Sequence, residues 1–319
     1  MSQLLVHLDG LLQPREEGAR RLARRELVPP HVLDQQRLLR TVHADLLDKP
    51  CTAPATITDS SGRVNTYSHF DMSPSDADLA AASSLPYLSG IASCLYACCT
   101  TRVDTAFHCA KLSRYCNSVT KDKYDALTTL ICYLFQTRKL RLTYGGPIKV
   151  PSIPSCRPPL NPTDLSALHG LLVISDSSWK TDATYRGHFI LCMNAAVDWA
   201  AALMKVMASS SEAEIGAGCH AGKRLVYVRN VWGELLSVLP KRAISHIVDN
   251  SALPHLTMNV GVSAKTEHFL RWQHILQYLV VHGWIRLHLC TTGDMLADPL
   301  TKVSFKPAYL TFRKVAMNL

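Results

Sequence analysis

The sequence lacks the cysteine patterns that mark zinc modules and disulfide-held scaffolds. No CxxC pair occurs among its 11 cysteines, and their number is odd. A chain of 319 residues is also too long for a small disulfide scaffold. We therefore expect reduced thiols that pack as small hydrophobic side chains, in a cytoplasmic or nuclear protein. A zinc-binding interaction module fits poorly, because the Cys and His spacings do not match those of zinc sites.

Long apolar runs are missing as well. No stretch reaches the roughly 18 uncharged apolar residues that indicate a membrane helix. The opening segment, MSQLLVHLDGLLQ, has no basic start and contains Asp9, so it makes a poor signal peptide. The sequence therefore predicts no membrane partner.

The composition is that of a basic globular protein. Hydrophobic residues make up 47% and charged residues 18%, which excludes wholesale disorder and allows a sizeable core. The 34 basic and 25 acidic residues leave a net charge of +9. A polyanion is the first candidate partner of such a protein, although the charge alone fits a purely solubilising role equally well.

The first half of the chain divides into two parts. Residues 1–60 are heterogeneous and include a charged helical stretch at 15–26, which fits a solvated helix face better than a phosphate-contacting arm. A loop rich in Ser, Thr, Asp and Ala is predicted at 53–84, so the second part, residues 61–146, begins inside this loop. Helical periodicity then runs over 85–144, so this part is predicted to be a small helical subdomain.

Proline marks the clearest boundary in the chain. Residues 147–162 contain six prolines, which excludes a helix interior or a central strand. We therefore predict that residues 147–168 link two domains.

Residues 169–302 alternate between strand-like and helix-like segments. Apolar runs predict strands at 169–176, 186–194, 197–201, 243–248 and 284–289. Amphipathic segments predict a helix from Ser209 onward, a helix over 266–282 and a last helix that opens at Asp298. This order indicates an α/β domain with a mixed sheet, followed by a C-terminal tail at 303–319.

Four carboxylates occupy positions where α/β sheets gather functional groups. Asp176 follows the apolar run LLVIS at the end of the first predicted strand, and Asp249 follows the predicted strand at 243–248. Glu214 lies in the first turns of a predicted helix, and Asp298 opens another. Converging carboxylates repel one another, and hard divalent cations such as Mg²⁺ or Mn²⁺ relieve that repulsion. A site with two such ions cleaves phosphodiesters.

Each acid also has a purely structural explanation. Asp298-Pro299 matches an ordinary helix start, Asp249 fits a turn and Asp176 fits a strand-end cap. Glu214 is easier to separate from its neighbour. Ser209 and Glu212 match a capping box, which gives Glu212 a structural role and leaves Glu214 as the better ligand candidate.

Four sequence motifs contain these acids. They are SDSSW at 175–179, SSSEAE at 209–214, VDNSA at 248–252 and the gap-free stretch 266–302, which ends in LADPLTK. With these motifs the sequence resembles the end of a copia-type retrotransposon Pol polyprotein, where the last part of the reverse transcriptase precedes the ribonuclease H domain. Upstream, residues 87–144 resemble the helical region that follows the polymerase palm, and residues 36–54 resemble the segment before that region.

The resemblance implies a fold and an activity. The expected fold is α/β, an RNase H-like mixed sheet flanked by helices and preceded by a small helical thumb/connection-like subdomain of a reverse transcriptase. The implied activity is cleavage of the RNA strand of an RNA–DNA hybrid with two Mg²⁺ (or Mn²⁺) ions. The implied catalytic and metal-binding residues are Asp176, Glu214, Asp249 and Asp298. The candidate hybrid contacts are Asn250, Ser251, Lys265, His268 and Lys302, each of which also fits ordinary solvated surface.

The sequence departs from the family pattern in several places. No YxDD motif occurs, residues 1–60 hold at most a degenerate reverse-transcriptase remnant, and most of the palm is missing. We therefore expect no polymerase activity and no small-molecule cofactor. Ser178 replaces a second Asp, the segment from Asp176 to Gly187 is short, and Leu270 and Trp272 replace charged residues.

These departures keep a second hypothesis open. A decayed or domesticated remnant would bind nucleic acid or a protein without cleaving. Without a palm, the helical subdomain would also expose apolar surface that suits a separate polymerase palm or a second copy of the chain.

Overall fold

The computed structural model describes residues 67, 70, 73–180, 183–204, 207–236, 241–258, 269–304 and 306–319. All of them lie within one compact unit of the chain. The helix expected at 15–26, the polymerase-like remnant of residues 1–60, and the candidate contacts Lys265 and His268 fall outside the described residues.

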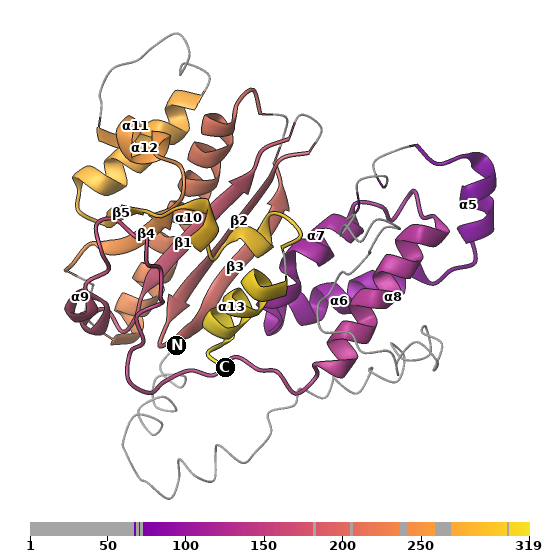
Figure 1. The fold of residues 1–319 in the computed structure, drawn as a ribbon, viewed down its shortest axis with the longest axis horizontal. Helices are drawn as coiled ribbons and strands as arrows, with labels where there is room; N and C mark the ends of the chain where they lie inside the picture. The colour runs from indigo at the N-terminus through magenta and orange to yellow at the C-terminus, as the bar shows by residue number, and fades with distance from the viewer. Residues whose placement is uncertain are drawn as a thin grey trace, which may run out of the picture. The chain divides into compact units, whose positions relative to one another are not determined.

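A five-stranded mixed sheet forms the centre of the structure (Figure 1). Its strands are β1 (Leu172–Ser178), β2 (Tyr185–Cys192), β3 (Ala195–Leu203), β4 (Ile244–Val248) and β5 (Ile285–Leu289), in the order β3-β2-β1-β4-β5. The first three strands are antiparallel, whereas β4 pairs parallel with both β1 and β5. The predictions of an α/β class and a mixed sheet are therefore confirmed.

Local sequence explains the β2–β3 hairpin. Its two turn residues, Met193 and Asn194, both have positive φ, as a two-residue turn that matches the strand twist requires. The Asn194 side chain accepts a hydrogen bond from the Lys149 N–H (2.8 Å) and donates to the carbonyl oxygens of Gly145 and Pro147 (2.9 Å each). The start of the proline-rich segment is thereby fixed to this turn.

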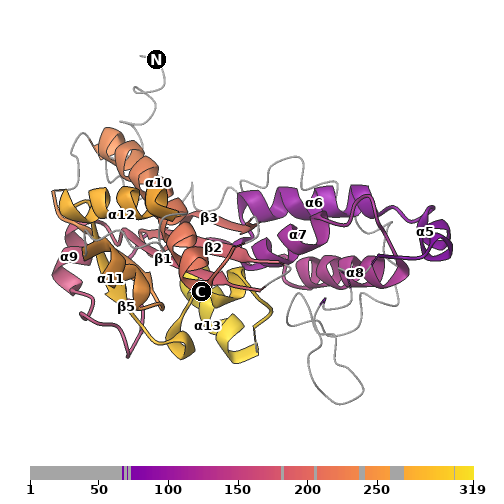
Figure 2. The same ribbon diagram turned by 90° about the horizontal axis from the view of Figure 1, so that it is seen from above.

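The two faces of the sheet are covered by different helices, as Figure 2 shows. The helices α10 (Ser210–Leu236) and α12 (Leu270–Val281) share a core with Ile190 of β2, together with Leu253 of α11 (Ala252–Met258). The next residue back along β2, Phe189, points to the opposite face. There it meets Phe312 of α13 (Lys306–Met317) edge to face, with ring centroids 5.4 Å apart.

Glycines let the helices of the first face approach closely. A Cβ added at Gly218 of α10 would lie 2.7 Å from a Leu253 methyl carbon, and one at Gly222 would lie 2.8 Å from a Leu279 methyl carbon. Since real Cβ atoms do not approach so closely, these positions of α10 depend on the missing side chain.

The helical region upstream of the sheet consists of α5 (Asp76–Ala82), α6 (Tyr87–Thr100), the 3-10 helix η2 (Val103–Thr105), α7 (Ala106–Ser113) and α8 (Lys121–Gln136). The helical periodicity predicted over 85–144 is confirmed for α6, α7 and α8 but not for residues 137–144, which form no helix. The loop predicted to reach residue 84 is wrong in its last part, because α5 lies there. Ser75 and Asp78 form a capping box that starts this helix, so the Ser- and Asp-rich composition marked a helix start.

A buried polar network joins the helical region to α13. Arg102 donates two hydrogen bonds to the Asp104 carboxylate, at 2.9 and 2.8 Å. The Tyr133 hydroxyl donates to the same carboxylate (2.5 Å). From α13, the Tyr309 hydroxyl donates to the Asp104 carbonyl at 3.0 Å and lies 2.8 Å from the Tyr133 hydroxyl. The segment expected as a C-terminal tail is thus mainly a helix packed on both regions.

The proline-rich segment runs beside the sheet. Arg157 exchanges two backbone hydrogen bonds with Leu289 of β5, at 2.7 and 2.8 Å. His288 of the same strand lies 2.6 Å from the Pro158 carbonyl oxygen. A short helix, α9 (Pro162–Ala167), follows before β1.

Two short 3-10 helices lie beyond β5, η4 (Thr292–Asp294) and η5 (Asp298–Leu300). Asp298 therefore opens η5 and not the last helix, and its N-cap is Ala297. The expectation of a last helix starting at Asp298 is wrong, because that helix, α13, begins at Lys306.

Within the described part of the chain, no single helix is long and apolar enough to cross a membrane. The pair α5 and α6, bent by 72°, reaches the required length and composition together.

Candidate metal centre

Three carboxylates from three separate elements converge at one edge of the sheet. Asp176 lies within β1, Glu214 in the first turns of α10, and Asp249 directly after β4. One oxygen from each lies within 4.8 Å of the other two. The parallel pairing of β1 with β4 explains this convergence, since both strands then direct their carboxyl ends to the same edge. Asp176 lies inside β1, which continues to Ser178, whereas the sequence predicted it at the end of the strand.

Each of these three acids accepts a hydrogen bond from a hydroxyl group. Thr301 donates to Asp176 Oδ2, Ser177 donates to Glu214 Oε1 at 2.7 Å, and Thr292 donates to Asp249 Oδ2 at 3.0 Å. Sequence reasoning missed all three donors. Two of them lie inside the quoted motifs SDSSW and LADPLTK, so the motifs held a signal for them.

The fourth acid is held differently. Asp298 Oδ1 lies 2.8 Å from Lys302 Nζ, at the i,i+4 spacing of a helical turn. Asp298 is not among the three acids whose oxygens lie within 4.8 Å of one another. The structure thus brings three of the predicted acids together and pairs the fourth with a cation.

Burial and mutual repulsion perturb the acids. Burial raises the pKa of Asp176 well above its usual range, and the charges of Glu214, Asp298 and Asp249 add to the rise. Burial, with the charge of Asp249, raises the pKa of Glu214 to about 8. Burial also raises the pKa of Asp298, in spite of Lys302. Carboxylic acids placed this close cannot all ionise without a compensating cation.

The two glutamates of α10 separate as predicted. The Ser209 hydroxyl accepts a hydrogen bond from the Glu212 N–H (3.1 Å), and the Glu212 carboxylate accepts one from the Ala208 N–H (2.6 Å). Glu212 therefore closes the start of the helix, one residue earlier than a standard capping box would. Glu214 is free of that role and faces Asp176 and Asp249.

The candidate hybrid contacts fall into two groups. Asn250 and Ser251 follow Asp249 directly, with Asn250 half-buried and Ser251 exposed. Lys302 is partly exposed and pairs its ammonium group with Asp298. Among the apolar replacements, Trp272 packs on Gly216 of α10, whose added Cβ would lie 3.2 Å from the indole ring.

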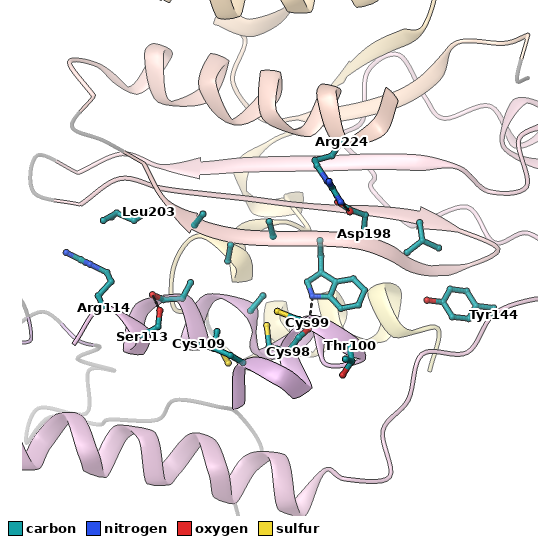
Figure 3. Close-up of a pocket in the computed structure, with 18 residues that line it drawn as sticks. Cys98, Cys99, Thr100, Cys109, Ser113, Arg114, Tyr144, Asp198, Leu203 and Arg224 are labelled. Atoms are coloured by element: carbon teal, nitrogen blue, oxygen red, sulfur yellow. Dashed lines mark hydrogen bonds and ion pairs between the residues drawn. The ribbon is translucent and has the colours of Figure 1, made fainter. Parts of the chain in front are cut away.

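A cavity of about 730 Å³ lies elsewhere, between the helices α6 and α7 and the edge strand β3 (Figure 3). Its lining includes Cys98, Cys109, Arg114, Trp199 and Arg224. None of the four acids lines this cavity, so the acid cluster and the cavity are separate features of the described residues.

Comparison with known proteins identifies similar sequences. The chain is 25% identical over 220 residues to the retrovirus-related Pol polyprotein from transposon TNT 1-94 of Nicotiana tabacum. The aligned residues make up 69% of this chain and 15% of that protein. It is 25% identical over 236 residues to the corresponding polyprotein from transposon RE2 of Arabidopsis thaliana (72% and 15%), and 23% identical over 230 residues to that from RE1 (70% and 14%). The chain is similar to retrotransposon Pol polyproteins.

This similarity confirms the resemblance that the motifs indicated. The chain spans about 15% of the length of the curated relatives it matches. No protein-family model matches the sequence. The relatives are named as Pol polyproteins, and the particular chemistry of this chain has to be argued from the acid cluster.

Proposed function

We propose that the chain is a divalent-metal-dependent ribonuclease that cleaves the RNA strand of RNA–DNA hybrids, without polymerase activity. The observation that carries this proposal is the convergence of Asp176, Glu214 and Asp249, which lie far apart in sequence, within 4.8 Å. The similarity to Pol polyproteins supports it. In this proposal residues 169–302 are an RNase H-like domain and 61–146 a thumb/connection-like subdomain.

The donor set suits a hard cation. The three converging groups are all carboxylates, and oxygen-only ligands favour Mg²⁺ or Mn²⁺ over zinc or copper. Asp176, Glu214 and Asp249 would hold the metal, with Asp298 as a fourth acid. When bound, such ions supply the activation of water and the stabilisation of the leaving oxygen that phosphodiester hydrolysis needs.

The chain's own residues would set up this chemistry. Thr301, Ser177 and Thr292 fix the orientation of one carboxylate each through their hydroxyl groups. Asn250 and Ser251, beside Asp249, are the proposed contacts to the hybrid. Phosphates and 2′-hydroxyls would be recognised there without reading the bases.

A cleavage assay tests the proposal. An end-labelled RNA paired with DNA is incubated with the full chain and Mg²⁺ or Mn²⁺, beside an EDTA control and the variant Asp249→Asn. We expect metal-dependent cleavage that Asp249→Asn slows by about 100-fold or more, since residues acting as a unit are each needed. Asp122→Asn, in the first turn of α8, is the matched control and should cleave like the wild type.

One observation favours a second function, nucleic-acid binding without cleavage. Asp298 is paired with Lys302 and stands outside the three converging acids. Binding of the intact hybrid in both metals, with no cut RNA, would support this second function and contradict the first.

A further inference from the structure

Lys302 is a basic residue beside the four acids and interacts with them electrostatically. Its Nζ lies 2.8 Å from Asp298 Oδ1. Within the described residues, this is the only ion pair that any of the four acids makes. The charge of Lys302 also acts on Glu214, and the charges of Asp176 and Asp249 act on Lys302. One ammonium group therefore balances part of a charge that four carboxylates share.

Local structure explains why the ammonium is held there. The Lys302 N–H donates to the Asp298 carbonyl oxygen at 3.1 Å, which completes a helical turn from Asp298 to Lys302. The i,i+4 spacing then places the lysine side chain over the aspartate. Thr301, one residue earlier, is bound to Asp176. Two neighbouring residues thus contact two different acids: Thr301 binds Asp176, and Lys302 pairs with Asp298.

The geometry also divides the cluster into two halves. Asp176, Glu214 and Asp249 bring their oxygens within 4.8 Å of one another, which is the arrangement that one cation needs. Asp298 already has a cation of its own. A metal ion at Asp298 must therefore displace the Lys302 ammonium, whereas a metal ion at Asp176, Glu214 and Asp249 displaces no paired side-chain cation of the described residues.

We propose that Lys302 is the resident counter-ion of Asp298, so that the cluster takes one divalent ion at Asp176, Glu214 and Asp249 and takes a second only in competition with the Lys302 ammonium. This inference rests on the proposed function, because it assumes that the acids are a metal site. It gives Lys302 a role in controlling metal occupancy, beyond a contact to the hybrid.

Calorimetric titration of the full chain with Mn²⁺ tests the inference without any substrate. The variant Lys302→Met removes the charge and keeps the length of the side chain. We expect the wild type to show one strong Mn²⁺ site. In Lys302→Met a second Mn²⁺ should bind at least about tenfold more tightly than any second Mn²⁺ binds to the wild type. Lys302→Arg keeps the charge and should behave like the wild type. Lys139→Met removes an exposed lysine after α8 and serves as the matched control.

A second variant secures the assignment of the second site. Asp298→Asn in the Lys302→Met background should remove the gained site and leave the first within about twofold. Circular dichroism of each variant checks that the fold is kept. Identical isotherms for the wild type and Lys302→Met would overturn the inference, and so would two equally strong sites in the wild type.

The result is separable from that of the cleavage assay. If the hybrid is cleaved and the Mn²⁺ isotherms of the wild type and Lys302→Met are identical, the inference is overturned and the proposed function stands. A second Mn²⁺ site gained by Lys302→Met in a chain that cuts no hybrid supports the inference and contradicts the proposed function. Absence of Mn²⁺ binding to the wild type contradicts both.

Discussion

Single hydroxyl groups hold the acids of the candidate centre in place. Thr301 is only 1% exposed, and its hydroxyl donates to the Asp176 carboxyl group. Asp176 is equally buried, so a loss of this donor cannot be made good by bulk water.

Substitution of Thr301 therefore tests the hydroxyl directly. We expect Thr301→Val to lower the free energy of unfolding by about 1–3 kcal/mol, because a buried polar group loses its partner. Thr301→Ser keeps the hydroxyl and should recover most of that loss. Urea denaturation of the three proteins measures the difference. A Thr301→Val protein as stable as the wild type would show that the hydroxyl contributes nothing measurable to stability.

At this scale the sequence predicts the acids better than their surroundings. Asp176, Glu214 and Asp249 stand out because each is a carboxylate near a strand or helix end, and the structure brings them together. The hydroxyl donors could not be predicted, because Ser177 meets Glu214 across 37 residues and Thr301 meets Asp176 across 125. Such contacts depend on the register of the folded chain and not on local pattern.

Among the elements, η5 depends on a close approach to the sheet. A Cβ added at Gly187 of β2 would lie 2.4 Å from the Leu300 Cβ and 3.0 Å from its backbone. Gly187 is the cross-strand partner of Asp176. The glycine therefore lets η5, which carries Asp298, sit directly on the strand beside Asp176.

The variant Gly187→Ala tests this packing. We expect a loss of about 1–3 kcal/mol in the free energy of unfolding, since neither Leu300 nor its backbone can move away freely. Gly293→Ala in η4 is the matched control, because its added Cβ meets nothing within 4 Å. That control should stay within about 0.5 kcal/mol of the wild type. A Gly187→Ala protein as stable as Gly293→Ala would contradict the described position of η5.

Strands and long helices could be predicted from the sequence, and short elements could not. Apolar runs located all five strands to within a few residues, because β1, β2 and β4 are almost completely buried and need continuous apolar sequence. The helix α11 and the separation of η5 from α13 were missed. The helices α11 and η5 are short, so their sequences carry too few turns for a periodic pattern.

For the molecule as a whole, α13 ties the helical region to the sheet. Tyr309 is hydrogen-bonded to the Asp104 carbonyl, and Phe312 of the same helix packs on Phe189 of β2. We expect the two regions to unfold in one transition. All five tryptophans lie between residues 179 and 284, so their fluorescence reports on the sheet region.

Urea unfolding followed by two signals checks this coupling. Tryptophan fluorescence and far-UV circular dichroism, which also reports on α6, α7 and α8, should give coincident midpoints. A circular dichroism transition that continues after the fluorescence change is complete would show that the helical region is independently stable.

Buried histidines predict how stability depends on pH. Burial lowers the pKa of His108 and of His246 to about 3, whereas an exposed histidine in the unfolded chain titrates near 6.5. At these histidines the unfolded state binds more protons below pH 6.5, so they lower stability as the pH drops towards 3, whereas Glu214, whose pKa is raised to about 8, contributes in the opposite direction. Each histidine should cost on the order of 2 kcal/mol at pH 5.

Urea denaturation of the wild type and of His246→Gln at pH 7.5 and pH 5 isolates one of these contributions. The change in the free energy of unfolding between the two pH values should be about 2 kcal/mol more favourable in the variant. The same change in the variant and the wild type would assign the acid sensitivity to other groups.

The most direct test of the account is the fate of the RNA strand in a doubly labelled hybrid. Both strands carry distinct labels, and the full chain is added with Mn²⁺. We predict that the RNA is cut, that the DNA stays intact, and that the same RNA without its DNA partner is spared. Loss of cutting in Asp249→Asn would assign the reaction to the acid cluster. An intact RNA strand with Mn²⁺ present, or equal cutting by Asp249→Asn, would contradict the account.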